Sequence, residues 1–489
     1  TDSILSTIAF KTKMHSGNTP ESQVIPAEET YGSLDQTPKK RKRTAKKEQK
    51  EKRKKDKMPV DNQQPPQEVP SEPIVRQMVP VLSSNAQETD QKRITIMTYN
   101  LLAQSLVRRE IFPESGDAIK WKHRRPRLLK EILHYEPDVS CFQEMDHSNY
   151  VDTFKPEFEN AGYETCFSGI GKNHGCCIIW KRSKFTKLSD LTIEFDRFGI
   201  PTMTTNCIGL IVSLKCCETL PDELNSSNSG LVIGTTHLYW RPQSMYERVR
   251  QCLILCENLL KFKEEFGFET ILAGDFNSPP TDPTYKLMVK NTSLTEDEIL
   301  NLKASMRPFG EDSTSDDPPS TEDMVENSVD SMISDNDTGL LKNSSSISSP
   351  IQITQQTLPS MSVGNAQTES AIQFKPTLPE LLSKFASLPS CVSLYAQHLN
   401  SIDPENTIYS EPKFTIYGLY FKGALDYIFL FCQNDDNRNN EDIDKNVSSK
   451  VKVTKLLKMP PEEELLPLLP NYKFNSDHLC LMVELVGLV

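Results

Sequence analysis

Short apolar runs that end on polar residues recur along the chain, and amphipathic segments separate some of them. RITIMTYN at 93–100 alternates apolar and polar positions before it ends on an asparagine, a pattern that predicts a strand. Residues 121–136 and 245–262 carry apolar side chains at helical spacing, so both are predicted to be helices. Further strands are predicted at 138–144, 175–181, 207–216, 231–238, 270–276, 412–418, 423–431 and 478–486, and a further helix at 378–388.

This order of elements indicates an α/β (α+β) protein with two packed sheets flanked by helices. No tandem repeat is visible in the sequence, which argues against a solenoid. The apolar runs are well short of the ~18 residues that a membrane span needs, and no secretory signal is visible. The chain starts at Thr1 rather than at Met, which leaves an earlier targeting segment open.

A length of 489 residues alone suggests about two or three domains, but two polar segments lower that number. Only 37% of the residues are hydrophobic, and the deficit is local. Lys and Arg dominate 39–57, and 308–341 has no Lys or Arg but many Asp, Glu and Ser residues. Such segments bury too little apolar surface to offset the entropy of ordering. We therefore predict a disordered N-terminal region at 1–91 and one folded domain at 92–489, interrupted by a disordered acidic insertion at about 292–376.

Charge and cysteine usage narrow the function classes. The net charge of −12 does not favour nucleic-acid binding by the whole surface. Metal ions in a local cleft can nevertheless bind phosphates. The twelve cysteines have no paired C-x-x-C spacing, so we predict reduced, buried thiols in an intracellular protein rather than structural zinc. The basic run at 39–57 is either a solvated tail or a nuclear or nucleolar localisation signal that also contacts RNA backbone. We favour the localisation signal, and an additional cytoplasmic pool of the protein stays open.

Polar patches stand at the ends of six predicted strands. They are TYN (98–100), QE (143–144), THL (236–238), GDFN (274–277), LDY (425–427) and SDH (476–478). Each offers a carboxylate, an amide or an imidazole, and none offers a Cys or Ser nucleophile or a glycine-rich loop. Singly they are ordinary, because Asn100 or Asn277 fits a turn and His237 fits a core histidine. A carboxylate such as Asp426 in an apolar run needs a partner. As an ordered set, the patches indicate a site for a metal ion or a phosphate.

The ordered set resembles the exonuclease–endonuclease–phosphatase superfamily, whose members share the DNase I-like two-sheet sandwich. Within it, the chain resembles the carbon-catabolite-repression-type deadenylases over about residues 94–487, apart from the acidic insertion. The motifs that carry the resemblance are TYNLLAQ (98–104), WKHRR (121–125), HLYWRP (237–242), FKGALDYIF (421–429) and LPNYKFNSDH (469–478). YERVRQ at 246–251 and the lack of leucine-rich repeats ahead of the catalytic part are most similar to the fungal Ngl RNA exonucleases.

The resemblance implies a single catalytic domain that uses Mg²⁺, for which Mn²⁺ can substitute. Glu144 is implied as the main metal ligand, supported by Asn100 and Asp477, and hard oxygen ligands suit Mg²⁺. Phe421 resembles the family aromatic residue that stacks on a base near the scissile bond. Pro242 matches the residue on the opposite face of that base.

The resemblance also implies the catalytic roles. Asp275 is expected to orient or deprotonate the attacking water, with Asn277 beside it on the phosphate. His478 is expected to act on the scissile phosphate while Asp426 holds its ring. His237 is expected to donate a further hydrogen bond to the developing charge.

The implied activity is that of a Mg²⁺-dependent 3′→5′ exoribonuclease that trims RNA 3′ ends, either poly(A) tails or ribosomal RNA precursors, and releases 5′-nucleotides. His174-Gly175 stands where relatives commonly have Asp-Gly, and Arg241 where deadenylases commonly have Asp, so a strict preference for poly(A) is not implied. One alternative is a phosphatase of the same fold that acts on a small phosphorylated substrate such as a nicotinamide dinucleotide. The other is a catalytically silent RNA-binding scaffold, against which the intact set of polar residues argues.

Overall fold

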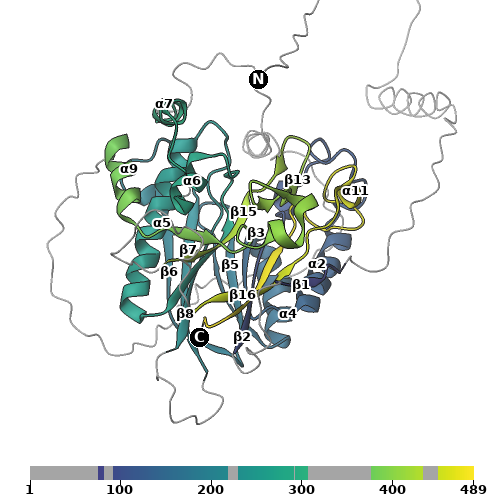
Figure 1. Cartoon of the computed structure of the whole chain (residues 1–489). Helices are drawn as coiled ribbons and strands as arrows, with labels where there is room; N and C mark the ends of the chain where they lie inside the picture. The colour runs from purple at the N-terminus through teal and green to yellow at the C-terminus, as the bar shows by residue number, and fades with distance from the viewer. Residues whose placement is uncertain are drawn as a thin grey trace, which may run out of the picture. The chain divides into compact units, whose positions relative to one another are not determined.

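Two mixed β-sheets lie face to face in the computed structural model, with helices on their outer faces (Figure 1). The structure describes residues 75–81, 92–217, 229–290, 292–306, 376–432 and 450–488, all within the unit Val69–Val489. The basic run at 39–57 and most of the acidic insertion lie outside the described residues.

The first sheet has seven strands in the order β1-β16-β17-β2-β3-β5-β4. In that order they span Met78–Pro80, Lys452–Leu457, Leu481–Val486, Arg93–Asn100, Val139–Asp146, His174–Lys181 and Tyr163–Ser168. Strands β2 and β3 are parallel and are joined through helix α2 (Trp121–Tyr135), whereas the other neighbours are antiparallel. A parallel pair needs such a crossover, because the chain must return to the end of the sheet where the first strand began before it starts the second.

The second sheet has six strands in the order β10-β15-β9-β8-β7-β6. In that order they span Cys391–Ser393, Asp426–Phe431, Glu269–Asp275, Gly230–Thr236, Ile208–Cys216 and Phe185–Glu194. The parallel pair β8–β9 is joined by the long helix α5 (Met245–Phe266), and the remaining pairs are antiparallel. Each sheet therefore contains one parallel pair with a helical crossover.

Shorter elements complete the described part of the chain. The helices are η1 (Gln104–Leu106), α3 (His147–Asn149), η2 (Tyr150–Phe154), α4 (Lys155–Asn160), η3 (Phe195–Arg197), α6 (Pro283–Val289), α7 (Glu296–Ala304), α9 (Leu378–Ser387), α10 (Leu399–Ile402), η4 (Pro404–Asn406) and α11 (Glu462–Leu465). Two small hairpins pair β11 (Thr407–Ile408) with β12 (Glu411–Pro412), and β13 (Ile416–Tyr417) with β14 (Lys422–Gly423). None of the helices in the described ranges combines the length and apolar character that crossing a bilayer requires.

Three apolar layers hold the sheets and helices together. The central layer fills the space between the sheets, with residues such as Ile96 and Val139 from one sheet and Leu210 and Ile271 from the other. A second layer packs α5, α6, α7 and α9 on the outer face of the six-stranded sheet, and a third packs α2 and α4 on the seven-stranded sheet. The predicted two-sheet sandwich flanked by helices is confirmed. All twelve cysteines are free thiols, and most of them are buried.

The strand directions bring the predicted site residues to one edge of the sandwich. Parallel strands β2 and β3 run toward this edge, as do β8 and β9. Strand β15 begins there, because it is antiparallel to β9 and pairs Asp426 with Asp275. Strand β17 also begins there, since Leu481 pairs with Thr98 near the end of β2. Six polar patches that are far apart in the sequence therefore converge.

Both predicted boundaries of the folded domain need correction. Strand β1 pairs with β16 and is preceded by the buried Arg76, so residues 75–81 belong to the fold rather than to a disordered region ending at 91. Helix α7 lies inside the predicted insertion of 292–376, has a capping box at Thr295 and buries Leu302. Its apolar contacts with the outer layer explain why these residues fold despite their acidic neighbours. Residues 307–375 lie outside the described residues.

Candidate active site

A buried asparagine joins the two sheets at the shared edge. Asn100 is the last residue of β2. Its side-chain amide donates to Glu144 Oε1 over 2.9 Å and to Asp275 Oδ2 over 3.0 Å, so it contacts one carboxylate from each sheet. Its side-chain oxygen accepts from the backbone NH of Leu102 over 3.0 Å. Asn100 therefore fixes the spacing between the acidic groups of the two sheets.

A β-bulge aims Glu144 at the site. The pairing of β3 with β5 shifts register between Phe142 and Met145, and Glu144 has a left-handed backbone with φ of 53°. Residues other than glycine adopt this conformation at a cost, and bulges of this kind commonly redirect a side chain beside a functional site. Glu144 Oε2 accepts from the backbone NH of Ala103 over 3.0 Å, which fixes the carboxylate against the chain that follows β2.

The chain turns sharply after Asp275, and this turn explains the polar end of GDFNSPP. Asn277 has φ of 48°, a left-handed value that asparagine tolerates better than most residues. Its backbone NH donates to Asp275 Oδ1 over 2.9 Å, and its side-chain amide donates to the carbonyl of Leu238 over 2.8 Å. Asn277 therefore orients the Asp275 carboxylate and ties the turn to the chain that follows β8.

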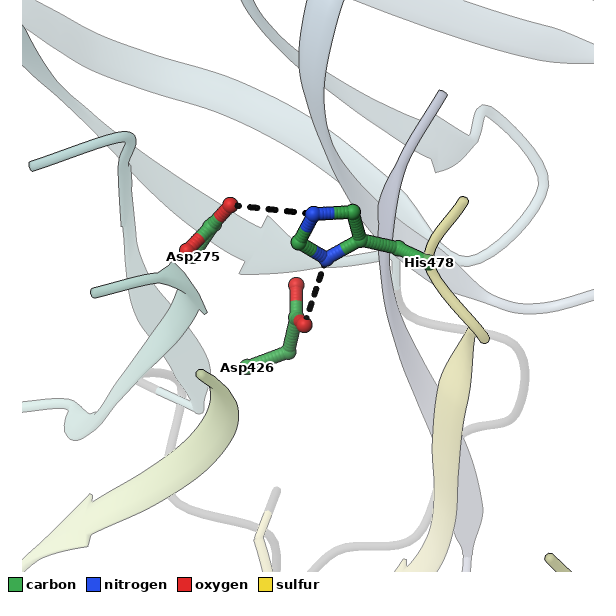
Figure 2. A group of neighbouring side chains, drawn as sticks. All are labelled: Asp275, Asp426 and His478. Carbon is green, nitrogen blue, oxygen red and sulfur yellow. Dashed lines mark hydrogen bonds and ion pairs between the residues drawn. The ribbon is translucent and has the colours of Figure 1, made fainter. Parts of the chain in front are cut away.

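His478 lies between two buried carboxylates (Figure 2). Its Nδ1 is 2.8 Å from Asp426 Oδ2, and its Nε2 is 3.7 Å from Asp275 Oδ2. Burial disfavours the charged ring, but the charges of Asp426 and Asp275 outweigh burial and raise the pKa of His478 well above its ordinary value. Thr415 Oγ1 donates to the same Asp426 oxygen over 2.6 Å. The structure thus supplies the partner that the buried Asp426 was predicted to need.

His237 approaches the same carboxylate from the second sheet. It follows β8, and its Nε2 lies 3.6 Å from Asp275 Oδ2. The backbone NH of Leu238 donates to the carbonyl of Asp275 over 3.0 Å, which holds the two segments together. Asp275 Oδ2 is therefore surrounded by the amide of Asn100 and by the imidazoles of His237 and His478.

Asp477 adds a further carboxylate near Glu144. Burial raises the pKa of Asp477 to about 6, helped by the charge of Glu144 and opposed by His478. Burial also disfavours the charged form of Glu144, but His237 and His174 outweigh it and hold the pKa of Glu144 below its ordinary value. Two neighbouring carboxylates in a buried site suit a divalent cation, because its charge offsets theirs.

Arg124 clamps the two segments that carry these oxygen ligands. It is buried, its Nε donates to the carbonyl of Asn475 over 2.7 Å, and its Nη2 donates to the carbonyl of Leu102 over 2.8 Å. Leu102 lies two residues after Asn100, and Asn475 two residues before Asp477. One guanidinium therefore holds together loops that are more than three hundred residues apart in the sequence.

Within the described ranges, one group of side chains has ligand atoms close enough together to hold a metal ion. Asp275, Asp426 and His478 have ligand atoms within 4.8 Å of one another. Both ring nitrogens of His478 already face carboxylates, so this group suits proton handling and charge stabilisation better than metal binding. The predicted ligands Glu144 and Asp477 offer carboxylate oxygens, the type that Mg²⁺ and Mn²⁺ prefer in proteins. The side-chain oxygen of Asn100, the third predicted ligand, is bonded to the backbone NH of Leu102, and its amide faces Glu144 and Asp275. The residues present therefore fit a divalent metal.

The two predicted base-binding residues lie at the surface. Phe421 is 40% exposed beside the turn of the β13–β14 hairpin. Pro242 is exposed, and its carbonyl accepts from Arg248 Nη2 over 3.0 Å. Arg248 is itself buried and paired with Asp282 over 2.7 Å, so the loop that carries Pro242 is tied to the turn after β9.

Sequence reasoning missed some residues that build the site. Thr415 gave no signal, because a threonine in a strand-like run is ordinary. Arg124 was part of a family motif, but its contacts depend on loops that meet only in the folded chain. His174 stands out in the sequence only as a departure from the family pattern. It is buried beside Glu144 and His237, and burial followed by the charge of Lys172 lowers its pKa to about 4, although Glu144 opposes this.

Comparison with known proteins identifies the family and supports the fold. Residues 97–360 match the model of the Endonuclease/Exonuclease/phosphatase family. A probable RNA exonuclease of Schizosaccharomyces pombe is 33% identical over 430 residues, which cover 86% of this chain and 81% of the relative. RNA exonuclease NGL2 of Saccharomyces cerevisiae is 29% identical over 434 residues, covering 80% and 78%. The crystal structure of ANGEL2, a 2′,3′-cyclic phosphatase, has a TM-score of 0.55 at 22% identity and covers 85% of this chain and 99% of that chain.

The two-sheet fold and its polar edge define a hydrolase of the nuclease and phosphatase class. The chain belongs to the Endonuclease/Exonuclease/phosphatase family, and it is similar to fungal Ngl RNA exonucleases as the sequence motifs predicted. The family match ends at residue 360, whereas the structure places Asp426 and His478 in the same site as Asp275.

Proposed function

We propose that the protein is a Mg²⁺-dependent 3′→5′ exoribonuclease that trims RNA 3′ ends and releases 5′-nucleotides, with Mn²⁺ able to replace Mg²⁺. The observation that carries the proposal is the convergence around Asp275 of the Asn100 amide and the His237 and His478 imidazoles. Such a cluster suits the hydrolysis of a phosphate diester, which needs a base for water and positive charge around the phosphate. Relatives named as RNA exonucleases support RNA as the substrate.

Asp275 is placed to accept the proton of the attacking water. Its Oδ1 is held by the backbone NH of Asn277 and its Oδ2 by the Asn100 amide, so the carboxylate is oriented before substrate arrives. The water oxygen bonds to phosphorus, the proton passes to Asp275, and the bond from phosphorus to the 3′ oxygen of the preceding nucleotide breaks. The departing 3′ oxygen takes up a proton from solvent and becomes the new 3′ hydroxyl. The products are a 5′-nucleotide and an RNA one nucleotide shorter.

The positive groups stabilise the charge that develops on the phosphate. His478 is held in its charged form by Asp426 and Asp275, and its Nε2 faces Asp275 (Figure 2). His237 adds a second imidazole near the same oxygen of Asp275. A divalent metal held by Glu144 and its oxygen neighbours would supply further charge to the phosphate and to the departing 3′ oxygen.

Product analysis on single-stranded RNA labelled at its 5′ end tests the proposal. With Mg²⁺ or Mn²⁺ we expect a ladder of RNAs shortened from the 3′ end and free 5′-nucleotides, and with a chelator we expect neither. RNAs ending in A-runs and in mixed sequence show whether poly(A) is preferred. Intact RNA together with phosphate release from a nicotinamide dinucleotide phosphate would favour the small-molecule phosphatase instead. No turnover of either substrate would favour the silent scaffold.

We further propose that the basic run at 39–57 directs the protein to the nucleus or nucleolus and adds contacts to RNA backbone. The support is the density of Lys and Arg in this run, since such segments serve as nuclear addresses and bind phosphates. Microscopy of the full chain and of a chain that lacks residues 1–74 tests it. An unchanged cellular distribution of the truncated chain would contradict the proposed localisation signal.

A further inference from the structure

Three consecutive apolar side chains are exposed beside the catalytic edge. Leu419, Tyr420 and Phe421 are 44%, 55% and 40% exposed, and they form the tip of the β13–β14 hairpin. Exposed apolar residues that stand singly are common, but a run of three at one tip usually has a function. Only Phe421 has a role by resemblance, so Tyr420 is without one.

The turn itself does not account for Tyr420. Tyr417 pairs with Lys422, and the backbone NH of Gly418 donates to the carbonyl of Phe421 over 2.9 Å, which leaves Leu419 and Tyr420 as the two turn residues. Two-residue hairpin turns favour Asn and Gly, because the preferred turn types need positive φ. Neither turn residue has positive φ. Local turn geometry thus gives no reason for two large apolar residues here.

The hairpin is built into the catalytic centre. The backbone NH of Tyr417 donates to the carbonyl of Asp477 over 3.1 Å, and that of Leu479 donates to the carbonyl of Thr415 over 2.7 Å. Thr415 in turn bonds to Asp426. The base of the hairpin therefore shares its hydrogen bonds with the residues on both sides of His478, and the tip has a fixed position relative to them.

Aromatic and cationic groups gather on this hairpin. The ring of Phe421 lies against Gly423, where an added Cβ would approach Phe421 Cζ to 2.8 Å, so the glycine makes room for the ring. Lys422 Nζ lies 4.0 Å from the centroid of the Tyr417 ring, whose hydroxyl donates to Glu462 over 3.0 Å. That bond ties β13 to the neighbouring helix α11 (Figure 1). A rigid hairpin with exposed rings and a lysine suits a base and its phosphate.

We propose that Tyr420 is a second base-stacking residue, and that the hairpin tip binds the base next to the one on Phe421 in single-stranded RNA. The inference rests on the proposed exoribonuclease function and narrows its substrate to RNA with at least two unpaired 3′ nucleotides. Stacking needs no particular base, because every base has a flat apolar face, so Tyr420 contributes affinity rather than sequence preference.

Two binding measurements test the role of Tyr420. Fluorescence anisotropy with a labelled single-stranded oligoribonucleotide, in the presence of chelator, gives the dissociation constant without turnover. Stacking contributes about 1–3 kcal/mol per base, so Tyr420→Ala is expected to weaken binding roughly 5- to 150-fold, while Tyr420→Phe binds nearly as the wild type. A mononucleotide competitor should bind equally to all three proteins, since it has no second base.

The matched control is Tyr409→Ala, because Tyr409 is a 66% exposed tyrosine on a different hairpin turn, and we expect it to leave RNA binding unchanged. Equal RNA binding by Tyr420→Ala and wild type would overturn the inference, as would an equal loss of mononucleotide binding. A change in oligomeric state in Tyr420→Ala would assign the tip to a protein contact and also overturn it. Whether the wild type shortens RNA is measured separately, so failure of the proposed function is distinguishable from failure of this inference.

Discussion

At the scale of single residues, the site depends on side chains that each satisfy more than one partner. Asn100 bonds two carboxylates and a backbone NH, so a change there would disturb both sheets at once. Asp426 Oδ2 accepts from Thr415 and faces His478 Nδ1. These shared contacts hold the reacting groups in place before substrate binds. Such preorganisation is needed to stabilise the charge that develops in a transition state.

Asp426→Asn tests whether Asp426 holds His478 charged and oriented. An amide can keep a contact with the ring but carries no negative charge, so the imidazolium loses its closest counter-charge. We expect kcat on RNA to fall about 10²- to 10⁴-fold, the range typical for loss of a proton-handling group. Asp403→Asn is a control, because Asp403 is a buried aspartate at the end of α10 that accepts from Asn406. Wild-type turnover by Asp426→Asn would contradict the role.

At the scale of elements, the strands with continuous apolar runs were predictable and the mixed ones were not. The sequence predicts β2, β3, β5, β7, β8, β9, β15 and β17. These strands bury nearly all their residues, so their sequences are rich in apolar residues. Strands β4, β6 and β16 escape prediction because polar residues interrupt them, and β1 and β10 because three residues give no periodicity. Their existence depends on neighbours already in the sheet. The strand predicted at 412–418 is wrong, because these residues form only the ends of two short strands, β12 and β13.

The candidate site was largely predictable for the same reason. Parallel strands end at one edge, so polar residues such as Asn100 and Asp275 at strand ends must lie near each other once the pairing is known. Contacts that depend on the packing of distant loops were not predictable. Arg124 with Asn475 and Thr415 with Asp426 are examples, because no periodicity links the partners.

A buried carboxyl on β12 gives a prediction about pH and stability. Tyr285 of α6 donates to Glu411 over 2.7 Å, and burial raises the pKa of Glu411 from 4.5 to about 7 despite its hydrogen bonds with Ser393 and Tyr285. Between these values the unfolded carboxyl is ionised while the folded one keeps its proton. The free energy of unfolding therefore falls as pH rises through this window.

Glu411→Gln should remove this loss, because the amide keeps the bond to Tyr285 without a titrating proton. We expect the variant to be more stable than wild type by about 1–3 kcal/mol above pH 7, with a small difference near pH 4.5. Urea unfolding at several pH values measures it. Glu405→Gln, at an exposed neighbouring position, serves as the control. A difference that does not grow with pH would contradict the assignment.

At the scale of the whole molecule, the fold reaches further toward the N-terminus than composition suggests. Arg76 Nη2 donates to the carbonyl of Cys480 over 2.6 Å, and the Arg76 backbone NH donates to Tyr135 over 2.8 Å. These bonds connect β1 both to the segment that enters β17 and to the end of α2. The strand also covers the edge of β16, which would otherwise present unpaired backbone groups.

Two truncations separate the tail from the fold. A chain without residues 1–74 keeps β1 and is expected to melt like the full chain, while its RNA binding depends less on salt because the basic run is gone. A chain without residues 1–88 loses Arg76 and β1. Each buried hydrogen bond contributes about 0.5–1.5 kcal/mol, so we expect a loss of a few kcal/mol and a melting temperature lower by several degrees. Equal melting of the two truncations would contradict a structural role for β1.

We propose that one edge of the sandwich is a metal-dependent hydrolytic centre in which Glu144 is the main ligand. Turnover of 5′-labelled RNA with Mg²⁺ by Glu144→Gln, beside the exposed control Glu157→Gln on α4, tests it most directly. Loss of the metal's charge stabilisation is expected to slow the variant about 10³-fold or more, with an unchanged melting temperature in chelator. Near-normal Mg²⁺-dependent turnover by Glu144→Gln would contradict the assignment of Glu144 as the main ligand.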